Sequence, residues 1–146
     1  MNTILTVCIG NICRSPVAEG LLKQALPGKN VFSAGLGALV GHEAEPTAQE
    51  IARQHGLDIS SHRAQQLTSF LCRQADLILV MESIHKQEVE ARYPFTKGKV
   101  HCLGHISPKE RIEIADPYRQ PREAFEIAHD AITRGAAHWA GLIQRL

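Results

Sequence analysis

The segment Cys8-Ile9-Gly10-Asn11-Ile12-Cys13-Arg14-Ser15 decides the fold, because it joins a predicted buried strand to a predicted helix. Before it, residues 4–7 (ILTV) are apolar without alternation, which is typical of a strand buried on both faces of a parallel sheet. After it, a proline at position 16 and apolar residues at 21, 22, 25 and 26 predict a helix that begins near Ser15, with the hydroxyl near its cap. The segment is therefore predicted to be a loop between the carboxyl end of a strand and a helix N-terminus.

Such a junction binds anions, because unpaired backbone N–H groups and the positive end of the helix converge on it. Arg14 adds a planar fork that matches two phosphate oxygens. A thiol at a helix N-terminus beside an arginine ionises more readily than a free one, so we predict that Cys8 is a nucleophile at neutral pH. Gly10 and Asn11 tolerate the left-handed backbone angles that a loop curled around an oxyanion needs. Ser15 is placed to donate a hydrogen bond to the Cys8 sulfur.

Strand and helix patterns alternate along the rest of the chain. Further strands are predicted at residues 31–34, 75–81 and 99–103, and helices at 46–55, 67–72, 83–92 and from 122 onward. This alternation predicts an α/β fold, an open four-stranded parallel sheet with helices on both faces and the phosphate loop between the first strand and the first helix. Ligands of such sheets bind at the carboxyl ends of the strands, where Cys8 is expected.

The composition limits the classes of function. The chain has 146 residues, 44% of them hydrophobic, which predicts a single domain over residues 1–146. The 16 basic and 15 acidic residues leave a formal charge of +1, which argues against a nucleic-acid partner. No stretch approaches the roughly 18 apolar residues of a membrane span, and the first residues lack the pattern of a signal peptide. We therefore expect a cytoplasmic protein that does not insert into a membrane.

The four cysteines, Cys8, Cys13, Cys72 and Cys102, are expected to be free thiols, because structural disulfides are rare in a reducing compartment. Cysteine and histidine together could also form a zinc site, and the chain has eight histidines. Structural zinc usually takes close pairs of ligands, however, and we identify only Cys8 and Cys13 as such a pair, with an arginine adjacent. The sequence therefore predicts no metal site and no cofactor.

Two motifs resemble those of a known family. Residues 7–22, VCIGNICRSPVAEGLL, resemble the signature of the low-molecular-weight protein tyrosine phosphatases, and Asp116-Pro117-Tyr118 resembles their general-acid loop. The resemblance implies that phosphotyrosine is hydrolysed through a phosphocysteine intermediate, with Cys8 as nucleophile and Arg14 binding the phosphate and the transition state. Asp116 would protonate the leaving oxygen and then accept a proton from water. The remaining phosphate-loop residues would be Ile9, Gly10, Asn11, Ile12, Cys13 and Ser15.

The resemblance also implies supporting roles. Together with Asn11, Ser33 and His62 match a polar network that holds the phosphate loop in its active shape. Cys13 matches a second loop cysteine that can form a reversible disulfide with the nucleophile and so protect it from further oxidation.

The substrate cleft is expected beside the phosphate loop. Its walls would include the glycine-rich segment 35–41 and the side chains of Ile9, Leu39, Val40 and Tyr118. An aromatic ring there favours an aryl phosphate ester, and a deep cleft excludes the shorter phosphoserine.

Arg119 marks a departure from the animal members of the family, which carry a second tyrosine at this place. The chain is thus more similar to bacterial members, whose partners include autophosphorylating tyrosine kinases of exopolysaccharide or capsule assembly. We expect a phosphotyrosine protein of this kind as the substrate, and a monomeric enzyme.

Two alternatives keep the fold and change the function. Arsenate reductases of similar fold use the same loop cysteine and two further cysteines just after the third strand, but residues 81–92 contain none. A non-catalytic phosphate-binding module would be favoured if Cys8 or Asp116 were replaced, and both are present.

Overall fold

The computed structural model describes residues 1–146 and contains one four-stranded sheet with the order β2-β1-β3-β4. Strand β1 (Thr3–Cys8) pairs in parallel with β2 (Asn30–Gly35) and with β3 (Leu77–Val80), and β3 pairs in parallel with β4 (Val100–Cys102). The predicted α/β fold with an open parallel sheet is confirmed. Because β1 is a central strand and Cys8 is its last residue, the Cys8 thiol lies in the middle of the carboxyl edge of the sheet.

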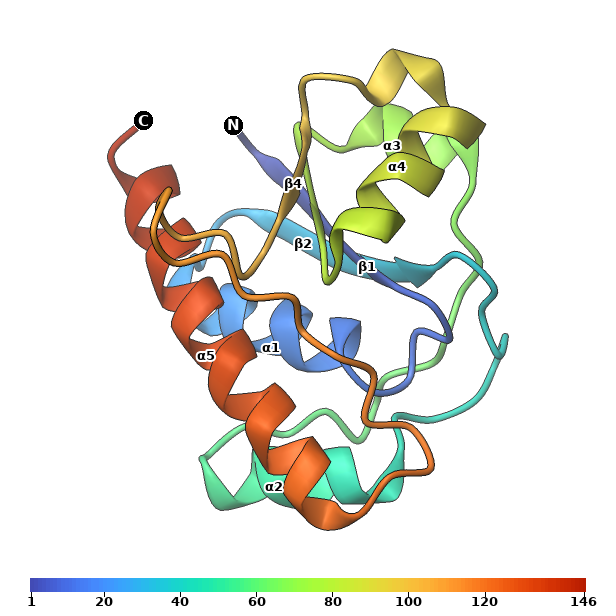
Figure 1. Cartoon of the computed structure of the whole chain (residues 1–146), viewed down its shortest axis with the longest axis vertical. Helices are drawn as coiled ribbons and strands as arrows, with labels where there is room; N and C mark the ends of the chain where they lie inside the picture. Colours follow the sequence, from blue (N-terminus) through green and yellow to red (C-terminus); the bar gives the residue numbers. More distant parts are fainter.

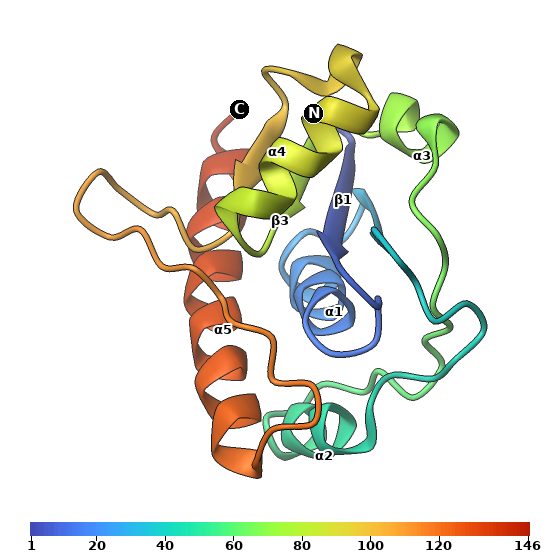
Figure 2. The same ribbon diagram turned by 45° about the vertical axis from the view of Figure 1, so that its right-hand side comes forward.

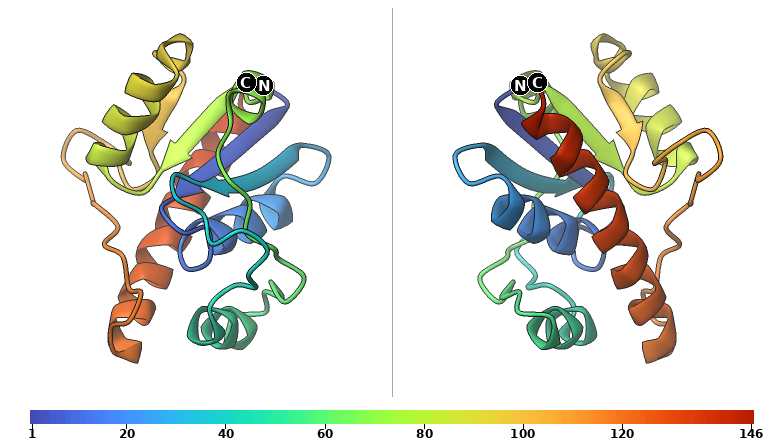
Figure 3. Two further views of the ribbon diagram at one scale, coloured as in Figure 1. Left: turned by 90° about the vertical axis from the view of Figure 1, so that its right-hand side faces the viewer. Right: turned by 90° about the vertical axis from the view of Figure 1, so that its left-hand side faces the viewer.

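Helices cover both faces of the sheet (Figures 1 and 3). They are α1 (Ser15–Ala25), α2 (Pro46–Gln54), α3 (Ser69–Gln74), α4 (Ser83–Arg92), the 3₁₀ turn η1 (Pro94–Thr96) and α5 (Arg122–Gln144). Helices α1 and α5 lie on one side of the sheet and α3 and α4 on the other, while α2 packs against α5 (Figure 1). No helix of the chain combines the length and the apolar character needed to cross a membrane.

The strands are buried on both faces, so alternate residues enter two separate cores. Ile4 and Leu79 belong to the core under α1 and α5, whereas Leu5 and Ile78 belong to the core under α3 and α4. This is why the strand segments are apolar throughout and show no alternation.

The third strand is shorter than the predicted range 75–81. Ala75 caps α3, and the carboxylate of Asp76 accepts hydrogen bonds from the backbone N–H groups of Asn2 and Thr3. The first two residues of the predicted strand therefore form a turn that is hydrogen-bonded to the N-terminal segment. Only residues 77–80 enter the sheet.

Residues 103–121, which we call the strap, connect β4 to α5 without a helix or a strand (Figure 2). The backbone hydrogen bond from Ile114 N to Met81 O at 3.0 Å attaches the strap to the residue that follows β3. A second bond, from Ile112 N to Gly104 O at 2.9 Å, joins two parts of the strap to each other. Gly104 permits this approach, because a Cβ atom there would lie 2.1 Å from the Ile112 carbonyl oxygen. The strap thereby brings Asp116 to the carboxyl edge of the sheet.

The burial of His129 on α5 leads us to expect that the protein becomes less stable in mild acid. Its ring is buried against His55, with ring centroids 4.5 Å apart, and its Nδ1 has no hydrogen-bond partner. Burial, together with the nearby His55, lowers the pKa of His129. The unfolded chain therefore binds a proton at His129 more readily than the folded chain does. The free energy of unfolding is unaffected by this group above the ordinary histidine pKa of about 6.5, and it decreases as the pH falls below that value.

Urea unfolding between pH 7.5 and pH 5 measures this effect. A single group of this kind lowers the free energy of unfolding by at most about 1.4 kcal/mol for each pH unit. The variant His129→Gln should lose less stability than the wild type over the same range. Equal slopes for the two proteins would contradict the assignment.

Candidate active site

The phosphate loop curls around the sulfur of Cys8, which is only 2% exposed. The backbone N–H of Asn11 donates a hydrogen bond to the sulfur at 3.3 Å, and the Ser15 hydroxyl lies 3.0 Å from it. Asn11 has a positive φ of 60°, a conformation that asparagine tolerates better than most residues. Helix α1 begins at Ser15 as predicted, but no side chain caps it. The Ser15 hydroxyl faces the thiol instead.

A buried network anchored on Asn11 holds the loop in this shape. The Asn11 amide donates to the hydroxyls of Ser15 at 2.7 Å and of Ser33 at 2.9 Å, and its oxygen accepts from Gln65 N at 2.9 Å. His62 Nε2 donates to the Asn11 carbonyl at 2.6 Å. The structure thus brings together Asn11, Ser33 and His62, which come from three separate segments. Since every polar atom of the Asn11 side chain is engaged, the unusual backbone angle is well supported.

Arg14 is a buried cation, 1% exposed, with only part of its guanidinium engaged by the protein. Its Nη1 donates to Glu82 Oε1 at 2.6 Å and to the Ile114 carbonyl at 2.7 Å. Its Nε has no hydrogen-bond partner, and Nη2 lies 3.8 Å from Asp116 Oδ2, too far for a hydrogen bond. The guanidinium is fixed along one side, and the other side suits a tetrahedral oxyanion.

A cavity of about 180 Å³ opens above the loop. It is lined by Cys8, Ile9, Gly10, Ile12, Cys13, Arg14, Gly37, Leu39, Asp116 and Tyr118. Leu39 and Gly37 supply the wall expected from the glycine-rich segment, but Val40 does not line the cavity and is 67% exposed. The prediction that Val40 forms part of the wall is therefore wrong. The turn that directs Leu39 inward leaves the next side chain in solvent.

Asp116 and Tyr118 reach the cavity from the strap. The backbone N–H of Tyr118 donates to Asp116 Oδ1 at 3.1 Å, which orients the carboxylate across Pro117. The guanidinium carbon of Arg119 lies 5.2 Å from the centre of the Tyr118 ring, within the range of a cation–π contact. Arg119 therefore covers part of the ring and helps to position it at the rim.

Cys13 also lines the cavity, and its environment differs from that of Cys8. It is buried, and this burial, followed by the nearby Asp116 carboxylate, raises the pKa of Cys13. Burial thus favours the neutral thiol of Cys13, which lies on the cavity wall together with Cys8.

Sequence reasoning missed three residues that support this site. Glu82 and the Ile114 carbonyl hold Arg14, and Glu19 Oε1 accepts a hydrogen bond from the Ser33 hydroxyl at 2.5 Å. Glu82 lies two residues after the end of β3, and this place at the carboxyl edge of the sheet was the one available signal in the sequence. Glu19 reads as an ordinary helix residue, and a backbone carbonyl gives no sequence signal.

Comparisons with known proteins agree with this geometry. A family model described as low molecular weight phosphotyrosine protein phosphatase matches residues 3–146. The probable low molecular weight protein-tyrosine-phosphatase EpsP of Ralstonia solanacearum is 54% identical over 146 residues, which cover 100% of this chain and 99% of that protein.

Solved structures add two informative neighbours. Vibrio vulnificus Wzb in complex with benzylphosphonate has a TM-score of 0.91 and 44% identity, covering 96% of this chain and 97% of that one. The YwlE arginine phosphatase from Geobacillus stearothermophilus has a TM-score of 0.92 and 35% identity, covering 99% of this chain and 94% of that one. The same fold therefore occurs in enzymes that differ in the phosphorylated side chain.

Proposed function

We propose, from the premise that this chain belongs to the low molecular weight phosphotyrosine protein phosphatase family, that it hydrolyses phosphotyrosine through a phosphocysteine intermediate. The observation that carries the proposal is the buried Arg14 guanidinium, whose Nε is unpartnered on the wall of a cavity that also contains the Cys8 thiol. A phosphoryl group bound there would place its phosphorus in front of the sulfur. Arg14 and the loop N–H groups would stabilise its equatorial oxygens.

The reaction follows from the positions of three side chains. The Cys8 thiolate attacks phosphorus and forms an S–P bond while the ester P–O bond breaks, and Asp116 transfers its proton to the departing oxygen. Water then attacks phosphorus, Asp116 accepts the water proton, and the S–P bond breaks to release phosphate and the thiolate. The Ser15 hydroxyl, 3.0 Å from the sulfur, stabilises the thiolate when it leaves.

The rim of the cavity supports an aryl ester as the substrate. Ile9, Leu39 and Tyr118 present apolar surface, and they are 45%, 37% and 38% exposed respectively. Asp116 is the one carboxylate among the lining residues, so a phosphoarginine guanidinium would find few hydrogen-bond acceptors beside the reacting group. Benzylphosphonate, which Vibrio vulnificus Wzb binds, carries an aromatic ring one atom away from phosphorus, as an aryl phosphate does. We therefore infer a preference for phosphotyrosine over phosphoarginine.

The proposed substrate is an autophosphorylating bacterial tyrosine kinase of exopolysaccharide or capsule assembly. Support comes from the bacterial character of the Asp116-Pro117-Tyr118-Arg119 segment and from the similarity to EpsP and Wzb. We place the enzyme in the cytoplasm as a monomer. Its four cysteines are free thiols, and a reducing compartment keeps the nucleophile in that form.

The test compares three peptides of one sequence that carry phosphotyrosine, phosphoserine or phosphoarginine, with EDTA present throughout. We expect kcat/KM for phosphotyrosine to exceed the other two values by about 100-fold or more, because only its ring spans the depth of the cavity and contacts the rim. A higher value for phosphoarginine would overturn the assignment of the substrate. Absence of turnover on all three peptides would overturn the enzymatic function itself.

Cys13 is proposed to protect Cys8 from irreversible oxidation. Hydrogen peroxide would oxidise the Cys8 thiolate to a sulfenic acid, and the Cys13 thiol would then form the disulfide with loss of water. Peroxide should inactivate the wild type, and a thiol should restore most of its activity, whereas Cys13→Ser should recover only a small part. Cys72→Ser, which removes a buried thiol outside the cavity, serves as the matched control. Equal recovery of Cys13→Ser and the wild type would exclude this role.

A further inference from the structure

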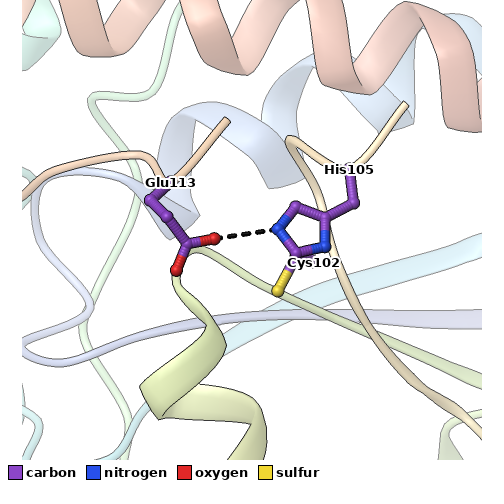
Figure 4. A group of neighbouring side chains, drawn as sticks. All are labelled: Cys102, His105 and Glu113. Atoms are coloured by element: carbon purple, nitrogen blue, oxygen red, sulfur yellow. Dashed lines mark hydrogen bonds and ion pairs between the residues drawn. The ribbon is translucent and has the colours of Figure 1, made fainter. Parts of the chain in front are cut away.

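Three potential metal ligands converge outside the active-site cavity, at the end of β4 and on the strap (Figure 4). Cys102 is the last residue of β4, while His105 and Glu113 belong to the strap. One donor atom from each lies within 4.8 Å of the other two, and His105 Nε2 is 2.8 Å from Glu113 Oε2. None of the three residues lines the active-site cavity.

The surrounding backbone fixes this arrangement. His105 N donates to the Cys102 carbonyl at 3.1 Å, so these two residues share a tight turn. The strap then returns through the hydrogen bond from Ile112 to Gly104, which places Glu113 beside the His105 ring.

Ser83, the first residue of α4, orients the carboxylate. Its backbone N–H donates to Glu113 Oε1 at 2.7 Å and its hydroxyl to Oε2 at 3.1 Å. The same hydroxyl lies 4.0 Å from the Cys102 sulfur. Residues of this kind, which hydrogen-bond to a ligand and hold its direction, support metal sites in general.

We propose that Cys102 Sγ, His105 Nε2 and the Glu113 carboxylate bind one divalent transition-metal ion of the zinc type. Thiolate, imidazole and carboxylate together suit Zn²⁺ or Co²⁺ and not Mg²⁺ or Ca²⁺, which prefer oxygen ligands alone. Binding converts the Cys102 thiol to a thiolate, whose proton passes to solvent, and no group changes its oxidation state.

The distances need only small adjustments to accept the ion. Metal–ligand bonds of 2.0–2.3 Å in a tetrahedral site place neighbouring donor atoms about 3.5 Å apart. The His105–Glu113 contact would therefore widen by less than an ångström, and the Cys102 sulfur would approach by about an ångström. His105 and Glu113 have side chains that are 26% and 48% exposed, so both have room to move.

The site is open on one side. Cys102, His105 and Ser83 line a cavity of about 430 Å³, which leaves the fourth coordination position to water. Lys86 and Arg111 also line this cavity and oppose a bound cation. Lys86 is paired with Glu90 at 3.2 Å, and the two anionic ligands offset the remaining positive charge.

The prediction of no metal site rested on Cys8 and Cys13 as the one close pair of ligands, and it missed the pair Cys102 and His105. The spacing Cys102-x-x-His105 is itself typical of metal ligands, but the third ligand is separated from it by a loop. The structure supplies that third ligand, so the proposed site departs from the sequence prediction of no metal site.

The test is a Co²⁺ titration of the full chain carrying Cys8→Ser, which removes the nucleophilic thiol as a competing ligand. One equivalent of Co²⁺ should produce the ultraviolet charge-transfer band of a cobalt–thiolate bond and the intense visible bands of a tetrahedral ion. Adding Cys72→Ser should leave both signals unchanged, since Cys72 is equally buried but lies outside the cluster. Adding Cys102→Ser should abolish the thiolate band.

Glu113→Gln provides an independent variant, because its side chain lies at the surface and the glutamine oxygen still accepts the hydrogen bond from Ser83 N. It should weaken Co²⁺ binding by about 10-fold or more, at least as much as loss of a supporting residue does at known sites. Zn²⁺ should displace Co²⁺ in the same stoichiometry. A thiolate band that survives Cys102→Ser, an unchanged affinity in Glu113→Gln, or no stoichiometric binding would each refute the site. None of these outcomes depends on phosphatase activity.

Discussion

Replacing Cys8 with serine is expected to lower kcat for an aryl phosphate by at least about 10⁴-fold, because a serine hydroxyl is not ionised at neutral pH and the hydrogen-bond partners of this position, Ser15 and the Asn11 N–H, are not general bases. The variant should still bind phosphate or vanadate with an affinity within a few fold of the wild type. The anion contacts come from Arg14 and the loop N–H groups, which the substitution leaves in place. Steady-state kinetics with EDTA and an oxyanion titration measure the two effects separately.

Cys72→Ser is the matched control for this variant. Cys72 is fully buried in the core under α3 and α4, away from the cavity, so its loss affects stability without touching the chemistry. It should retain kcat within about twofold of the wild type. Turnover by Cys8→Ser within 10-fold of the wild type would mean that the phosphoryl group is not transferred to this sulfur.

Replacing Asp116 with alanine is expected to lower kcat by about 10²- to 10³-fold for an ester whose leaving group is an ordinary phenol, with a pKa of about 10. The loss should be much smaller for a nitrophenol, since that leaving group departs as an anion without a proton. The dependence of the rate on leaving-group acidity should therefore be steeper in the variant than in the wild type. Measuring kcat for a series of substituted aryl phosphates determines this slope.

An exposed aspartate offers the control for Asp116→Ala. Asp130 on α5 lies outside the cavity, and Asp130→Ala should leave both the rates and the slope unchanged. If Asp116→Ala lost the same factor with every leaving group, the carboxylate would be acting on binding or on loop structure and not as the general acid.

The phosphate loop could be predicted from the sequence because its parts are contiguous. A buried strand, a loop and a helix start occupy consecutive residues, and each has its own local signal in residues 4–26. The positions of Cys8 and Arg14 in the loop could thus be predicted from their order in the chain alone. The helices beginning at Ser15, Ser83 and Arg122 were located for the same reason.

The supports of the loop could not be predicted in this way, because they join distant segments. Glu82 is 68 residues from Arg14, and the Ile114 carbonyl is 100 residues away. No local pattern specifies such a pair, and only the packing of the strap against the sheet brings it about. The cluster of Cys102, His105 and Glu113 depends on the same packing, and the exposure of Val40 depends on how one turn is oriented.

The attachment of the strap also has a consequence for local opening of the protein. The amide groups of Ala115 and Asp116 have no hydrogen-bond acceptor in the protein, and the preceding residue, Ile114, is held by its N–H to Met81 and by its carbonyl to Arg14. The amides of β1, in contrast, lie in the centre of the sheet. Deuterium should therefore enter residues 115–116 long before it enters residues 4–8. Asp116, the proposed proton donor, thus lies on a segment that opens more readily than β1, the strand that carries Cys8.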